Sequence, residues 1–253
     1  MEMFRDVSKR KIAPFGSISA CRRIHRLLTW RIYRKNWIDS SGKSDPPPDF
    51  YDPKHKLMME VMRIDDHAFV DQKGHIHNES LKHEGELYKK YLRDLDRDDL
   101  SMFIIPDTKL PTNDEHNYER YVANFERVFK HHEGRLELYN TNHPGFKTIF
   151  FILDESCAYQ QATDAKDVGI VKEGNEVIGM PHFFCSDKRF VDIIKNSKVD
   201  YVVWYAPYKL LRYINGRIIR EFPLPKCAIY DVKHIQPSDA IEYDLERMMS
   251  AEE

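Results

Sequence analysis

Apolar residues recur every three or four positions in two stretches of the chain, the spacing of a helix with one buried face. The first stretch, 17–37, begins with serines that can cap a helix and places its arginines mostly away from the apolar stripe. That stripe consists of Ile18, Cys21, Ile24, Leu28 and Ile32. The second stretch, 114–132, stops at Gly134 and has an apolar face made of Tyr118, Tyr121, Val122, Phe125, Val128 and Phe129.

Two other stretches, 147–153 and 201–205, are apolar without interruption, which predicts strands buried on both faces of a sheet. The remaining predicted elements are hairpins over 49–63, around 71–74 and over 210–221, and short helices over 80–92 and 190–196. The hairpin over 210–221 turns at Asn215-Gly216, a pair that favours tight turns. Together these elements predict a mixed α/β fold, with a central mixed β-sheet flanked by helices.

The proline-rich segment 39–48 marks the main boundary in the chain, because it ends the first helix and makes a stiff connection. We therefore predict a basic N-terminal arm with the first helix over 1–45, packed on the rest of the protein. Residues 46–253 are predicted to form a single α/β domain.

The composition is that of a globular protein, with 42% hydrophobic and 32% charged residues. The N-terminus lacks a secretory pattern, and no segment approaches the roughly 18 apolar residues of a membrane span. The four cysteines show no CxxC pair, which argues against a disulfide framework or a thiolate zinc site. We expect a cytoplasmic protein with reduced cysteines and no membrane partner.

Positive charge is concentrated at the N-terminus, although the net charge is only −2. Residues 1–37 contain ten Lys and Arg against Glu2 and Asp6. This distribution fits an anionic partner such as nucleic acid, with phosphate contacts from Arg22, Arg23, Arg26, Arg34 and Arg63. A solvated helix face would give the same pattern. The sequence leaves open DNA or RNA, and a monomer or a homodimer.

Two carboxylates are predicted to face each other across the hairpin over 49–63. If its turn centres on Lys54-His55, Asp49 lies directly opposite Glu60, with Met62 on the same face. Opposed carboxylates, about 5 Å apart at Cβ, repel each other unless solvent or a cation relieves the repulsion. Such a pair of carboxylates usually binds a hard divalent cation such as Mg²⁺.

The segment Pro48-Asp49, a short gap, then Glu60-Val61-Met62 resembles the core motif of the PD-(D/E)XK nuclease superfamily. The resemblance covers roughly residues 17–155 and implies that Asp49 and Glu60 hold Mg²⁺ or Mn²⁺. It also implies a core in which a helix, the hairpin, a second helix and a buried strand follow in this order. The implied activity is hydrolysis of a phosphodiester bond in nucleic acid.

Met62 departs from this pattern, because the superfamily has a lysine there that orients or activates water. A cation from the second helix, namely Arg120, Arg127 or Lys130, is a candidate replacement. The first helix also lacks a glutamate that many members use. Two interpretations therefore stand: a metal-dependent nuclease with an altered site, and an inactive domain that binds nucleic acid or another protein.

Two further groups of side chains could hold a metal. Asp154 follows a buried strand, where functional groups often emerge, and is a candidate third ligand for the ion at Asp49 and Glu60. His67, His75, His77 and His83 gather beside Asp65 and Asp66. Histidine is a common metal ligand, but a polar surface hairpin has the same composition. The sequence leaves this second site open.

Overall fold

The computed structural model describes residues 12–41, 48–78, 81–83, 85–86, 89, 116–167, 179–209, 211–215, 218–222 and 224–251. The predicted helix over 80–92 and the turn at Gly216 lie mostly outside these residues. No helix in the described part of the chain is long and apolar enough to span a membrane.

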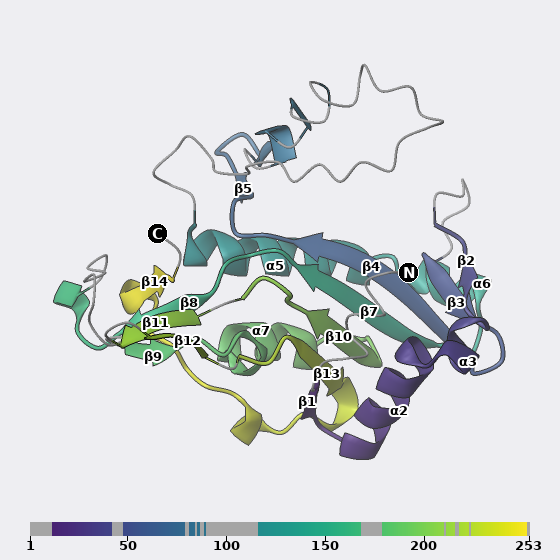
Figure 1. The fold of residues 1–253 in the computed structure, drawn as a ribbon. Helices are drawn as coiled ribbons and strands as arrows, with labels where there is room; N and C mark the ends of the chain where they lie inside the picture. Colours follow the sequence, from purple (N-terminus) through teal and green to yellow (C-terminus); the bar gives the residue numbers. More distant parts are fainter. Residues whose placement is uncertain are drawn as a thin grey trace, which may run out of the picture.

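A mixed sheet forms the centre of the fold (Figure 1). Its strands, from one edge to the other, are β1 (Ile12–Phe15), β13 (Cys227–Asp231), β10 (Tyr201–Tyr205), β7 (Lys147–Asp154), β4 (Leu57–Ile64), β3 (Phe50–Asp52) and β2 (Ile38–Asp39). Strands β4, β7 and β10 are parallel, whereas β3 and β13 run antiparallel to their neighbours in this central part. This mixed sheet with helices on its faces confirms the predicted fold class.

Helices cover both faces of the sheet (Figure 1). One face packs against α2 (Ile18–Thr29), which is followed by the short α3 (Arg31–Arg34). The other face packs against α5 (Tyr118–Glu133), α6 (Leu136–Asn142) and α7 (Lys188–Lys195). The side chains of Ser17, Asn117 and Asp187 cap α2, α5 and α7 by accepting hydrogen bonds from the first turn of each helix.

The strands at the centre are apolar on both faces because both faces are covered. Ile149 and Phe151 of β7 pack toward α2, while Phe150 and Ile152 pack toward α5. Strand β10 is buried along its whole length in the same way. The uninterrupted apolar runs therefore predicted these two strands correctly.

The first predicted helix is interrupted at Trp30, which has an extended backbone. The Thr29 hydroxyl donates to the His25 carbonyl, and the Trp37 indole N–H donates to the Leu27 carbonyl at 3.1 Å. The second of these bonds satisfies a carbonyl group that the end of a helix leaves without a partner. Because the direction changes here, Ile32 is 58% exposed and does not continue the buried stripe.

Smaller sheets and single turns complete the fold. A three-stranded sheet contains β14 (Met248–Ser250), β8 (Tyr159–Ala162) and β9 (Gly179–Pro181). Two hairpins are formed by β5 (Phe69–Val70) with β6 (Ile76–His77), and by β11 (Leu211–Asn215) with β12 (Ile218–Phe222), as predicted. The 3₁₀ turns are Ala165–Asp167, Phe184–Ser186, Val232–His234, Pro237–Asp239 and Leu245–Arg247.

Candidate active site

The β3–β4 hairpin has the register that the sequence predicts. Its turn is held by the buried Asp52, whose carboxylate accepts hydrogen bonds from the backbone of Lys54 and His55 and from the His55 ring. Phe50 pairs with Met59 and Asp52 with Leu57, so Asp49, one residue before β3, lies opposite Glu60.

The carboxylates of Asp49 and Glu60 lie side by side at the open end of this hairpin. The Asp49 N–H donates to Glu60 Oε2 at 3.4 Å, and the Val61 N–H donates to Asp49 Oδ2 at 2.8 Å. Glu60 is buried and Asp49 is half-buried. Burial raises the pKa of Asp49, the Val61 hydrogen bond lowers it, and the charge of Glu60 raises it further, with a net upward shift. The pair therefore carries repulsion that a bound cation would relieve.

Two side chains from the helical layer complete the site. His132 Nδ1 lies 2.8 Å from Glu60 Oε1, and Tyr139 lies close to the same carboxylate. Burial, reinforced by the charge of Glu60, raises the pKa of Tyr139, so its phenol stays protonated. The imidazole thus orients Glu60 from the helical side of the sheet.

The sequence contained a signal for His132 that the predictions above did not use. Phe125, Phe129 and His132 are separated by four and three positions, so His132 continues the stripe of α5 that packs on the sheet. Tyr139 had no such signal, because α6 was not predicted and its approach to Glu60 depends on the turn after α5.

The cations proposed to stand in for a lysine at Met62 have partners other than Glu60. Arg120 lies over the Phe69 ring, Arg127 donates to Asn124, and Lys130 pairs with Glu133. Met62 shares the face of Glu60, as predicted, but is buried in the core beneath α5. His132 is therefore the residue that supplies a protonatable nitrogen beside the carboxylates.

Asp154 does not lie beside Asp49 and Glu60, so the prediction that it is a third ligand for the same ion is wrong. Glu60 pairs with Phe150, so Asp154 lies four residues farther along β7, about 13 Å away along a strand. Its fully buried carboxylate accepts hydrogen bonds from Tyr121, Trp204 and Ser156 and pairs with the buried Lys209 at 3.3 Å. Asp154 is thus the acceptor of a separate, densely bonded cluster.

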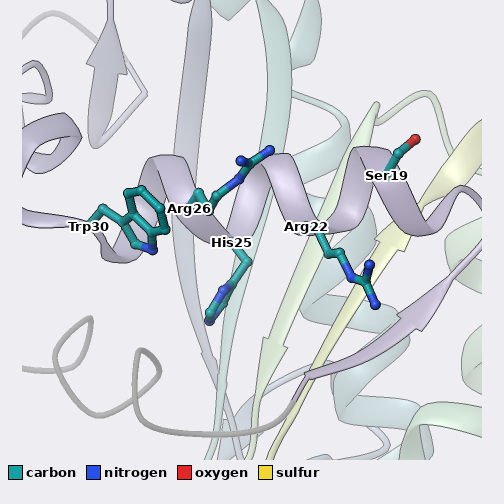
Figure 2. A pocket seen from close by; sticks show the side chains of 5 residues that line it. All are labelled: Ser19, Arg22, His25, Arg26 and Trp30. Carbon is teal, nitrogen blue, oxygen red and sulfur yellow. The ribbon is translucent and has the colours of Figure 1, made fainter.

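The arginines predicted to bind nucleic acid lie away from the carboxylate pair. Arg22, Arg23 and Arg26 are exposed on α2, on the opposite face of the sheet from Glu60, and Arg34 is half-buried on α3. Arg63 forms an ion pair with Glu155. Figure 2 shows Arg22, His25 and Arg26 on α2 and Trp30 just after it, and together with Ser19 they line a hollow of about 540 Å³.

The carboxylate oxygens of Asp49 and Glu60 are chemically suited to a divalent cation such as Mg²⁺ or Mn²⁺. The ring of His132 contacts Glu60 through Nδ1 and orients it. Comparison of the chain with protein family models, with curated proteins and with solved structures gives no match. What the site can do must therefore be inferred from its own residues.

Proposed function

We propose that this protein is a nucleic-acid-acting phosphodiesterase that depends on Mn²⁺ or Mg²⁺, with its active site at Asp49, Glu60 and His132. The observation that supports the proposal most strongly is the approach of two carboxylates and one imidazole at the open end of the β3–β4 hairpin. The order of α2, the hairpin, α5 and β7 also matches the order implied by the resemblance to PD-(D/E)XK nucleases.

The residues of the site have distinct roles in this proposal. Asp49 and Glu60 hold the cation, which would neutralise phosphate charge and lower the pKa of the attacking water. His132 orients Glu60 through the 2.8 Å contact and offers a nitrogen that accepts a proton. Tyr139 lies near Glu60 as a protonated phenol.

His132→Gln tests this assignment, because it removes the proton acceptor and keeps a polar side chain of similar length. We expect cleavage of single- or double-stranded DNA or RNA in Mn²⁺ to fall about 100-fold or more in kcat, with a smaller change in KM. The matched control is His131→Gln, since His131 is exposed on the same helix and should leave kcat within about twofold of the wild type. Equal rates for both variants would remove His132 from the mechanism.

A second candidate function is binding of nucleic acid without cleavage. The hollow on α2 favours it, because two arginines, one histidine and a half-exposed tryptophan combine phosphate contacts with a surface on which a base can stack. This surface does not depend on the carboxylate pair, which lies on the other face of the sheet.

Arg22→Gln combined with Arg26→Gln tests the α2 surface. We expect weaker binding of a fluorescent single-stranded oligonucleotide. The slope of the logarithm of the binding constant against the logarithm of the salt concentration should be less steep by about 1.4, or about 0.7 for each lost phosphate contact. Lys188→Gln combined with Lys195→Gln removes the same charge from α7 and should leave the slope unchanged. Equal slopes for the two double variants would contradict a role for α2.

A further inference from the structure

A second group of possible metal ligands lies just beyond the carboxyl end of β4. Asp66 and His67 lie two and three residues after this strand, and His116 lies two residues before α5. One ligand atom from each of the three residues lies within 4.8 Å of the others. The carboxyl ends of parallel strands in open α/β sheets are where ligands usually bind.

Only one oxygen of the Asp66 carboxylate accepts hydrogen bonds, while the other faces His67 Nε2 at 3.6 Å. Oδ2 accepts from His116 Nδ1 at 2.9 Å, from the Tyr159 hydroxyl at 2.6 Å and from the Cys157 N–H at 3.3 Å. Oδ1, on a fully buried residue, has no hydrogen-bond partner among the described residues. Buried polar atoms are rarely left this way, so each requires an explanation.

We propose that Asp66, His67 and His116 bind a divalent transition-metal ion, with Zn²⁺ as the best match. Three protein ligands of the His₂-carboxylate type are a frequent donor set for Zn²⁺ and leave a coordination position open. Ligand atoms about 2.0–2.1 Å from a tetrahedral ion are about 3.3 Å from one another. His67 Nε2 lies 3.6 Å from Asp66 Oδ1, close to that spacing, and His116 Nδ1 would exchange its 2.9 Å hydrogen bond to Asp66 Oδ2 for a bond to the ion.

The surrounding loop is built to hold these ligands in place. The carboxylate of Asp65 accepts hydrogen bonds from the N–H groups of His67 and Ala68 and from the Asn78 amide. The Asn124 amide of α5 donates to the Asp65 carbonyl at 3.1 Å. Loop and helix are thus tied together around the cluster, as the outer hydrogen bonds of metal sites commonly are.

The histidine ligands are open to solvent on one side. The His67 and His116 side chains are 14% and 17% exposed, which leaves a route for the ion from solvent.

This site is separate from the one at Asp49 and Glu60. Glu60 lies four residues before the end of β4, so about 13 Å of strand separates it from the beginning of the loop that carries Asp66. In sites where two metal ions act on one phosphate, the ions are only about 4 Å apart, so the two sites here would not act on the same phosphate. The histidines at 75 and 77, which the sequence also singled out, instead contact Asp71 on the surface.

Calorimetric titration of the metal-free full-length protein with Zn²⁺ tests the proposal. The titration uses an Asp49→Asn background, so that the carboxylate pair does not contribute. We expect one equivalent to bind, and His67→Gln or His116→Gln to weaken binding about 100-fold or more, whereas the surface control His75→Gln should have no effect. No binding in the background protein, or equal affinity in all three variants, would overturn the proposal.

Anomalous diffraction at the zinc edge provides a readout that does not depend on the folding of any variant. Crystals of the wild-type protein soaked in Zn²⁺ should show a peak between Asp66, His67 and His116. Absence of that peak would overturn the site, and it would leave the proposal for Asp49 and Glu60 untouched.

Discussion

Asp49→Asn is expected to reduce cleavage in Mn²⁺ or Mg²⁺ by at least about 1000-fold, which corresponds to about 4 kcal/mol of lost transition-state stabilisation. The amide is nearly isosteric and can still accept the Val61 N–H, but it lacks the charge that holds a cation beside Glu60. A steady-state cleavage assay with metal-depleted and metal-loaded protein measures the effect. Asp192→Asn, which alters an exposed carboxylate on α7, is the control and should retain full activity.

The same substitution should not destabilise the protein at pH 7. Because the pKa of Asp49 is raised, the folded state binds this proton more readily than the unfolded state does. The ionised carboxylate therefore costs stability at neutral pH, and that cost disappears as the pH falls through the folded pKa. We expect Asp49→Asn to melt at or above the temperature of the wild type at pH 7, with the difference shrinking as the pH falls and disappearing below 3.8, the ordinary pKa of Asp. Loss of activity together with a large loss of stability would point to misfolding instead.

Lys209→Ala is expected to lower the free energy of unfolding by about 3–5 kcal/mol, the cost of removing one partner of a buried charge pair. The ammonium group of Lys209 is fully buried and donates to the Ser156 hydroxyl at 2.5 Å and to the Cys157 carbonyl at 2.9 Å. Its removal leaves the charge of Asp154 in the core without a counterion. Urea unfolding followed by fluorescence measures the change.

A surface lysine provides the comparison for Lys209. Lys188 pairs with Asp192 on the exposed side of α7, and Lys188→Ala should cost less than about 1 kcal/mol. If the two alanine variants lost similar amounts of stability, the charge pair of Lys209 and Asp154 would not contribute as the structure indicates.

Local patterns were sufficient to predict the hairpin of the candidate site. Alternation along 57–63 and a turn centred on Lys54-His55 determine which residues lie opposite each other, so the pairing of Asp49 with Glu60 could be predicted without any other part of the chain. The buried strands β7 and β10 were equally predictable, because a short continuous apolar run is typical of a strand that is buried on both faces.

Contacts between distant segments were not predictable in this way. The parallel register of β4 and β7 places Asp154 four residues beyond the partner of Glu60, and nothing in either strand alone specifies that offset. His116 reaches Asp66 across fifty positions of sequence, so the metal cluster with His67 differs from the group of neighbouring histidines that the sequence singled out.

Anomalous diffraction from crystals soaked in Mn²⁺ tests the central proposal most directly, because it locates the ion without assuming a substrate. We predict a peak between the carboxylates of Asp49 and Glu60, within coordination distance of both, that is absent from crystals of Asp49→Asn. Wild-type crystals with no Mn²⁺ at this pair would contradict the assignment of Asp49 and Glu60 as the active site.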